Sequence, residues 1–348
     1  MAIAKPPGAV DFHTHVVPDV LPSAEGRDSR WPSIVLQSDD TAQVIISEKL
    51  FRRVDRRSWD PQSRIADMQD HGIAHQVLSP MPELLSYWFN GSDGEAICRA
   101  VNRFIADLVT AYPTRFSGFG MVPLQEPERA ARMMTDIRDA GLSGVEIGTH
   151  IDGMPLSDPS LEPFFAEAER LNLTVMVHAL HPAGTERVAK LPGLAGAAVF
   201  PLETALAAVA LMTSGVLEKN PALRIVLSHG GGALPVILPR LDHAWRLGPP
   251  LAQTMSVPPS ELARRFYYDS IVYGEAALRL LVETVGAERI VAGSDYPFRI
   301  MEDDPAGFVA RTVPPSAADK ILFETPHTIV GDLQERQARF DAMRGAKI

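Results

Sequence analysis

Short apolar segments typical of β-strands alternate along the chain with stretches of helical periodicity. The strand-like segments number eight, at residues 10–15, 75–79, 116–122, 144–149, 174–179, 225–229, 266–270 and 290–295. Helical patterns lie between them, for example at residues 93–112, 127–140, 161–171, 202–219 and 275–285. Alternation of strand and helix without a change in composition favours a (β/α)8 TIM barrel over a doubly wound sheet. We therefore expect residues 1–348 to form a single barrel domain.

A long insertion, at about residues 17–60, separates the first predicted strand from its helix. Residues 33–36 and 43–47 within it predict a small antiparallel excursion beside the barrel mouth. Long structured loops of this kind usually cover active sites. The insertion contains the arginines Arg27, Arg30, Arg52, Arg53, Arg56 and Arg57. Arginine can hold an anionic substrate through paired hydrogen bonds, although pairing with nearby aspartates or exposure to solvent is the simpler interpretation for any single one.

Composition narrows the classes of function. The chain has 348 residues, of which 46% are hydrophobic and 22% charged, so it can bury a large core. A net charge of −10 and a pI near 5.5 argue against nucleic acid or an anionic membrane as the main partner and indicate a small-molecule ligand. Cys98 is the single cysteine, which excludes an internal disulfide and a cysteine-based zinc cluster.

Two features of the sequence bear on where the protein works. The N-terminal residues lack the apolar region of a signal peptide, so we expect a cytoplasmic protein. The longest apolar stretch, residues 202–217, contains polar positions and is shorter than a membrane span. We therefore expect it to form a buried or interface helix, and we expect no membrane partner.

The first predicted strand contains the sequence Asp11-Phe12-His13-Thr14-His15. Successive side chains of a strand point to opposite faces, so Asp11, His13 and His15 are expected to share one side. Two neutral imidazoles held close together lose hydration unless they share a proton or a metal ion. A divalent transition metal is the commoner solution.

Three other predicted strands end in potential metal ligands or bases. The fifth ends at His178, the sixth at His229 and the eighth at Asp295. Each has an ordinary structural explanation when taken alone, such as a hydrogen-bonded core histidine or a capping aspartate. Because the C-terminal ends of barrel strands meet at one rim, the whole set predicts a metal site there.

This pattern resembles the amidohydrolase superfamily, whose hallmark is His-x-His on strand one, histidines on strands five and six, and an aspartate on strand eight. The resemblance extends from about residue 10 to about residue 333. The fourth strand, from Glu146 towards His150, lacks the lysine that many two-metal members carboxylate, which implies one metal ion. Within the superfamily the chain is most similar to the decarboxylase branch that acts on 2-amino-3-carboxymuconate 6-semialdehyde. Matching segments include residues 51–52, 59–61, 122–125, 229–232, 269–270 and 293–298, together with Arg240.

The resemblance implies a role for individual residues. The implied ligands of one divalent ion are His13, His15, His178 and Asp295. Zinc is the expected metal, and manganese, iron or cobalt would also suit these ligands. His229 is then a free general acid/base that activates metal-bound water. Arg52 and Arg240 bind substrate carboxylates, and Arg240 reaches the site of the neighbouring subunit in a homodimer.

The implied function is a metal-dependent, non-oxidative decarboxylase of a small conjugated carboxylate. No glycine-rich nucleotide loop is present, so no organic cofactor is indicated. A mononuclear zinc hydrolase of a lactone or amide is the main alternative, because the same ligands serve acyl transfer. A hydratase and a purely structural zinc site are further alternatives. Ala179-Leu180-His181 replaces the Pro-Trp that follows the strand-five histidine in related decarboxylases, so the substrate pocket is expected to differ.

Overall fold

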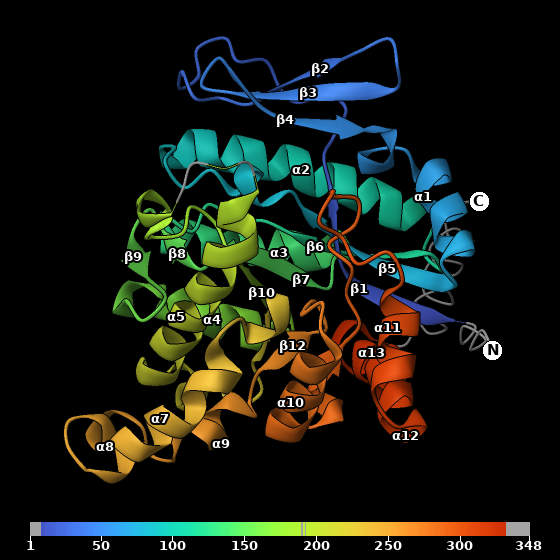
Figure 1. Ribbon diagram of the computed structural model, residues 1–348. Helices are drawn as coiled ribbons and strands as arrows, with labels where there is room; N and C mark the ends of the chain where they lie inside the picture. The colour runs from blue at the N-terminus through green and yellow to red at the C-terminus, as the bar shows by residue number, and fades with distance from the viewer. Residues whose placement is uncertain (1–7, 189–190, 192, 332–348) are drawn as a thin grey trace.

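Eight parallel strands form one sheet in the computed structural model, which describes residues 8–331 apart from 189, 190 and 192. The sheet follows chain order: β1 (Ala9–Val16), β5 (Ile73–Pro80), β6 (Phe116–Gly120), β7 (Gly144–Gly148), β10 (Thr174–His178), β11 (Arg224–Leu227), β12 (Tyr267–Asp269) and β13 (Ile290–Val291). Each strand lies within or overlaps a segment predicted from the sequence (Figure 1).

Hydrogen bonds between the first strand and the segment after the last strand close the sheet. The backbone N–H of Phe12 donates to the carbonyl of Ala292 at 2.7 Å. Further along, Thr14 and Tyr296 form a parallel bridge. The predicted (β/α)8 barrel is therefore confirmed, and its closure brings residues near 13 beside residues near 295.

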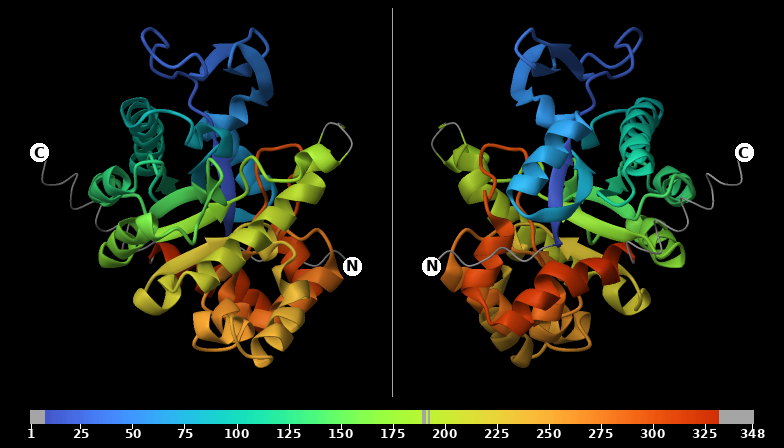
Figure 2. Two further views of the ribbon diagram at one scale, coloured as in Figure 1. Left: turned by 90° about the vertical axis from the view of Figure 1, so that its left-hand side faces the viewer. Right: turned by 90° about the vertical axis from the view of Figure 1, so that its right-hand side faces the viewer.

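Helices surround the strands (Figures 1 and 2). They are α1 (Pro61–Asp70), α2 (Gly91–Ala111), α3 (Pro127–Asp139), α4 (Glu162–Arg170), α5 (Phe200–Thr213), α6 (Val216–Lys219), α7 (Leu234–Arg246), α8 (Leu251–Thr254), α9 (Pro259–Ala263), α10 (Glu275–Val285), α11 (Pro305–Thr312), α12 (Pro315–Asp319) and α13 (Thr325–Val330). The helix predicted over residues 202–219 is divided into α5 and α6, because Gly215 adopts a left-handed conformation with φ of 75°.

Local sequence explains where these helices begin. Asp60 accepts a hydrogen bond from the backbone N–H of Ser63 at 2.8 Å, and Pro61 occupies the first turn of α1. Asn90 caps α2 in the same way. The buried residues Ile97, Val101 and Ile105 of α2 recur at helical spacing and form the face that packs towards β6.

The insertion follows β1 in the chain and forms a separate antiparallel sheet (Figure 1, top). Its strands are β2 (Ser33–Leu36), β3 (Thr41–Ile46) and β4 (Lys49–Asp55). The sequence predicted the excursion but not β4. The first three residues of β4 are exposed, and buried and exposed positions do not alternate regularly along it, so the usual strand signal is missing.

Residues Ala195–Thr213 are long and apolar enough to cross a membrane, with a mean hydropathy of 1.7, and 44% of that window is buried. The α5 part of this segment packs against β10 and α7 as one element of the helical layer. Its apolar character is accounted for partly by this burial and partly by exposed leucines on its outer side.

A fully buried arginine of α1, Arg64, fixes the first strand where it carries the histidines. Its guanidinium donates to the carbonyl of His15 at 2.9 Å and to the hydroxyl of Thr14 at 3.0 Å. It also lies 4.7 Å from the ring of Tyr296, in the segment that closes the barrel. Burial lowers the pKa of Arg64 to about 10, so it remains charged at neutral pH.

We predict that Arg64→Met lowers the free energy of unfolding by about 3 kcal/mol or more, because it leaves buried acceptors without a donor. Arg56→Met is the matched control. Arg56 is 48% exposed and paired with Asp40 and Asp60, so its loss should cost less than about 1 kcal/mol. Urea denaturation measures both variants. Equal stability of the two variants would contradict the role assigned to Arg64.

Candidate metal centre and active site

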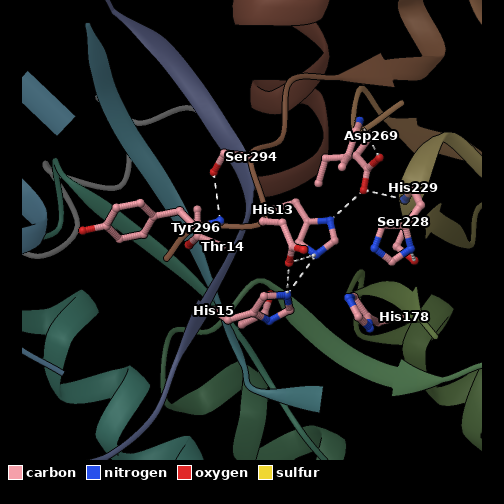
Figure 3. A network of polar contacts seen from close by, with 12 residues as sticks. His13, Thr14, His15, His178, Ser228, His229, Asp269, Ser294 and Tyr296 are labelled. Carbon is pink, nitrogen blue, oxygen red and sulfur yellow. Dashed lines mark hydrogen bonds and ion pairs between the residues drawn. The ribbon is translucent and has the colours of Figure 1, made fainter. Parts of the chain in front are cut away.

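Four predicted ligand residues converge at the barrel mouth. His13 and His15 come from β1, His178 ends β10, and Asp295 follows β13. Each offers one ligand atom, and these atoms all lie within 4.8 Å of one another. All four side chains are buried, and Figure 3 shows the three imidazoles facing a common point.

Each imidazole is oriented by a hydrogen bond from its outer nitrogen. Nδ1 of His13 lies 2.6 Å from a carboxylate oxygen of Asp269. Nδ1 of His15 lies 3.0 Å from the carbonyl of Pro80, and Nδ1 of His178 lies 2.9 Å from the carbonyl of Ala179. Because these partners only accept, the proton of each neutral ring is on Nδ1 and Nε2 presents a lone pair to the cluster.

The cluster therefore contains acceptors without donors. The Nε2 atoms of His13 and His15 are 3.0 Å apart, and Oδ1 of Asp295 is 3.1 Å from Nε2 of His15. Nε2 of His178 and Oδ1 of Asp295 are buried without a hydrogen-bond partner. Facing lone pairs in a buried site repel one another unless a cation lies between them. Three imidazole nitrogens and one carboxylate oxygen fit a divalent transition metal.

The protonation of His15 and His178 agrees with this interpretation. Burial lowers the pKa of His15 to about 4 and lowers the pKa of His178 well below its usual value. Both rings are therefore neutral at neutral pH, which is the form that binds metal. Burial also acts to lower the pKa of His13, but the hydrogen bond and charge of Asp269 outweigh it and raise that pKa.

Asp11 does not join the cluster, contrary to the expectation from strand alternation. The pairing register of β1 with β5 shifts between Asp11 and Thr14, so one extra residue of β1 is accommodated there. The carboxylate of Asp11 instead accepts hydrogen bonds from the hydroxyl of Ser294 at 2.6 Å and from its backbone N–H at 3.0 Å. Asp11 thus supports the segment that leads to Asp295.

Asp269, at the end of β12, is a supporting residue to which the sequence analysis assigned no role. Besides His13, its carboxylate accepts the backbone N–H groups of His229 at 2.9 Å and Gly230 at 2.8 Å. It therefore positions a cluster histidine and the turn that carries His229 (Figure 3). The rule that barrel chemistry lies at strand ends could have identified it.

The fourth predicted histidine, His229, lies beside the cluster but outside its four ligand atoms. Its ring centroid is 5.0 Å from that of His178 and 5.7 Å from that of His13. Its Nδ1 lies 3.1 Å from the hydroxyl of Ser228, and burial lowers its pKa. The backbone of His229 is left-handed, with φ of 55°, a strained conformation for a non-glycine residue that is common at functional sites.

Arg52 of β4 is connected to the cluster by the ring of Phe298, which contacts both Arg52 and His15. Its guanidinium lies 4.1 Å from the ring centroid of Phe298, and that ring stacks on His15 with centroids 4.8 Å apart. Four other arginines of the insertion form ion pairs with aspartates: Arg27 with Asp93, Arg30 with Asp28, Arg56 with Asp60 and Arg57 with Asp55. The simpler interpretation of the arginine-rich segment therefore holds for those four.

Arg240 does not contact the cluster of its own chain within the described residues. It lies on the exposed side of α7. Within the part of the chain that the structure describes, it has neither a hydrogen bond nor an ion pair.

The family model described as Amidohydrolase matches residues 10–331. The chain belongs to the amidohydrolase family. It is 33% identical over 306 residues to the 2-amino-3-carboxymuconate-6-semialdehyde decarboxylase of Dictyostelium discoideum, covering 86% of this chain and 84% of that protein. The sequence-based assignment to the amidohydrolase superfamily is thereby confirmed.

Several similar proteins of solved structure are also decarboxylases. The 5-carboxyvanillate decarboxylase of Sphingomonas paucimobilis superposes with a TM-score of 0.76 at 25% identity, covering 93% of this chain and 98% of that chain. The corresponding enzyme of Novosphingobium aromaticivorans, which contains bound manganese, gives a TM-score of 0.69 at 25% identity, covering 78% of this chain and 81% of that chain. The protein is accordingly placed with the metal-dependent carboxy-lyases of the amidohydrolase family.

We predict that Asp269→Asn weakens metal binding by roughly 10- to 100-fold, because His13 loses the charged acceptor that orients it. Competition with a metal chelator measures the affinity. Asp242→Asn is the matched control, since Asp242 also accepts a backbone N–H, from Ser260 at 2.9 Å, but lies on α7. Unchanged affinity in Asp269→Asn would show that this carboxylate does not support the metal site.

Proposed function

We propose that this protein is a metal-dependent, non-oxidative decarboxylase of a small conjugated carboxylate such as 2-amino-3-carboxymuconate 6-semialdehyde. The observation that carries the proposal is the buried cluster of four converging ligand atoms. His229 lies beside this cluster and is not one of its ligands. The similarity to the Dictyostelium decarboxylase supports the substrate. We propose zinc as the native metal, held by His13, His15, His178 and Asp295, because imidazole-rich sites suit it, and manganese, iron and cobalt as the alternatives.

Decarboxylation breaks a carbon–carbon bond and leaves an electron pair on the substrate carbon. Without an organic cofactor, the conjugated system of the substrate takes up these electrons until a proton replaces the lost CO2. When bound, a divalent metal supplies Lewis-acid stabilisation of anionic oxygen and lowers the pKa of water. The remaining requirements are a base that exchanges protons and a cation that orients the substrate.

His229 is the proposed general acid/base. Its Nδ1 faces the hydroxyl of Ser228, which leaves Nε2 for the substrate side of the ring. Because burial lowers its pKa, His229 is neutral at neutral pH and can accept a proton from water at Nε2. The same nitrogen then returns a proton to the carbon that has lost CO2.

Arg52 is the proposed anchor for a substrate carboxylate. Its guanidinium contacts the ring of Phe298, which also stacks on His15, so we place a carboxylate bound there beside the cluster and away from the group that leaves. This separation matters because a cation that holds the leaving carboxylate tightly would oppose its departure. We therefore assign Arg52 to positioning of the substrate.

The direct test measures CO2 release by the metal-loaded protein from freshly generated 2-amino-3-carboxymuconate 6-semialdehyde. We expect turnover of about 1 per second or faster, within the usual range of enzymes. No release from this compound would exclude it as the substrate and direct the test to aromatic carboxylates. Formation of a new acid from a lactone or amide without CO2 would favour the hydrolase alternative.

Two variants test the division of roles. His229→Asn should keep its metal and lose roughly 10²- to 10⁴-fold in turnover, as expected when a general acid/base is removed. His13→Ala should lose both metal and turnover, because it removes a ligand. Metal analysis together with CO2 release separates the two cases. Full activity in His229→Asn would overturn the proposed mechanism, and loss of its metal would make His229 a ligand.

We further propose a homodimer formed through α5 and α7, which pack side by side. Their outer surfaces expose Leu206 and Val236, which are 60% and 70% exposed, and such patches typically mark an interface. Arg240 lies one helical turn after Val236 and so shares its face. This placement supports a role for Arg240 in the site of the neighbouring subunit.

Val236→Glu should convert the dimer to a monomer, because it places a charge in an apolar interface. Sedimentation velocity measures the mass. Leu280→Glu is the control, since Leu280 is also exposed, at 40%, but lies on α10.

In a mixed dimer of His229→Asn and Arg240→Ala subunits, one of the two sites should regain both residues and activity. Absence of this recovery would place Arg240 outside the catalytic site.

A further inference from the structure

A buried carboxylate, that of Glu83, is left incompletely paired near Arg52. Glu83 lies in the short 3-10 helix η2 (Pro82–Leu85) that follows β5. Its side chain is only 9% exposed, and Oε2 is buried without a hydrogen-bond partner. Oε1 lies 3.8 Å from a terminal nitrogen of Arg52, which is beyond hydrogen-bond distance. Burial of a carboxylate oxygen without a donor is costly, so its retention requires an explanation.

Glu83 is linked to the metal cluster through Arg52, which lies 3.8 Å from its carboxylate. Burial raises its pKa, the charge of Arg52 lowers it, and the negative charge of Asp295 raises it further. Arg52 is linked in turn to His15 through the ring of Phe298. A chain of contacts therefore leads from Glu83 through Arg52 and Phe298 to His15 of the cluster.

His229 lies on a different side of the same cluster. Its ring neighbours there are His13, His178 and Phe200. A substrate that reaches His229 with its reacting carbon and Arg52 with a carboxylate must extend across the cluster towards Glu83. The unpartnered Oε2 of Glu83 is the acceptor available near Arg52 for a group on the substrate close to that carboxylate.

We propose that Glu83 determines substrate specificity by accepting a hydrogen bond from an amino or hydroxyl group of the substrate, close to the carboxylate that Arg52 holds. This inference rests on the proposed function and names its substrate class, which is carboxylates with an N–H or O–H donor next to the anchored carboxylate. An ionised carboxylate only accepts hydrogen bonds, so a substrate without this donor leaves Glu83 unpaired and facing a like charge. Sites with buried polar groups reject analogues that cannot pair with them.

The test compares the binding of two unreactive probes, 3-aminophthalate and phthalate, which differ by one amino group. Their Kd values for the metal-loaded protein are measured by calorimetry. We expect the wild-type protein to prefer 3-aminophthalate by roughly 10- to 100-fold, the range for a hydrogen bond to a charged group. Glu83→Leu should abolish this preference, and Glu83→Gln should retain part of it, because its amide oxygen still accepts.

Two further variants distinguish the hydrogen-bonding role of Glu83 from the effect of losing a charged side chain elsewhere. Arg52→Met should weaken both probes by a similar factor, since each contains the anchored carboxylate. Glu95→Leu should leave both Kd values unchanged, because Glu95 pairs with Arg99 and Arg129 on α2 and α3. Together they establish whether the preference depends on Glu83 rather than on the loss of any arginine-paired glutamate.

Equal binding of the two probes by the wild-type protein, or binding of neither, overturns the inference. Retention of the full preference in Glu83→Leu overturns it as well. CO2 release is a separate readout of the proposed function. A preference that depends on Glu83 in a protein that releases no CO2 from any donor-bearing carboxylate would uphold the binding role and overturn the decarboxylase proposal.

Discussion

The site depends on the repulsion between lone pairs that the fold forces to face one another. Hydrogen bonds behind His13, His15 and His178 keep their outer nitrogens protonated, so the inner nitrogen of each neutral ring has no proton to share. The fold holds these atoms together through backbone closure and through buried contacts such as those of Arg64. The site therefore lowers the stability of the folded chain when no cation is bound. Metal binding should in turn stabilise the folded chain.

Barrel closure determines how the ligand atoms that repel one another are positioned. The hydrogen bond from the backbone N–H of Asp295 to the carbonyl of His13, at 2.9 Å, joins residues that are far apart in sequence. Left-handed backbone at His229 and Asp295 then turns both residues away from ideal strand geometry at the rim. Asp269 supports both parts of the site, because it binds one cluster histidine and the amides of the turn that contains His229.

Strand periodicity and strand-end chemistry were enough to predict the barrel and the convergence of His13, His15, His178 and Asp295. They failed where the backbone departs from regular repetition. A register shift in β1 removed Asp11 from the side that simple alternation assigned to it. The strand that carries Arg52 escaped prediction because an exposed strand lacks a buried face. Glu83 could not be recognised from sequence, since only its burial and an oxygen without a hydrogen-bond partner distinguish it from a surface glutamate.

The small sheet β2–β3–β4 lies outside the barrel, yet it supplies Arg52. The cluster residues and His229 belong to the barrel strands and to the turns at their ends. In the proposed function, substrate anchoring and bond cleavage are therefore encoded in different stretches of the chain. Changes in residues 33–55 then alter the anchoring of the substrate while the metal ligands keep their positions. The insertion is accordingly a suitable segment for exchange between homologous enzymes.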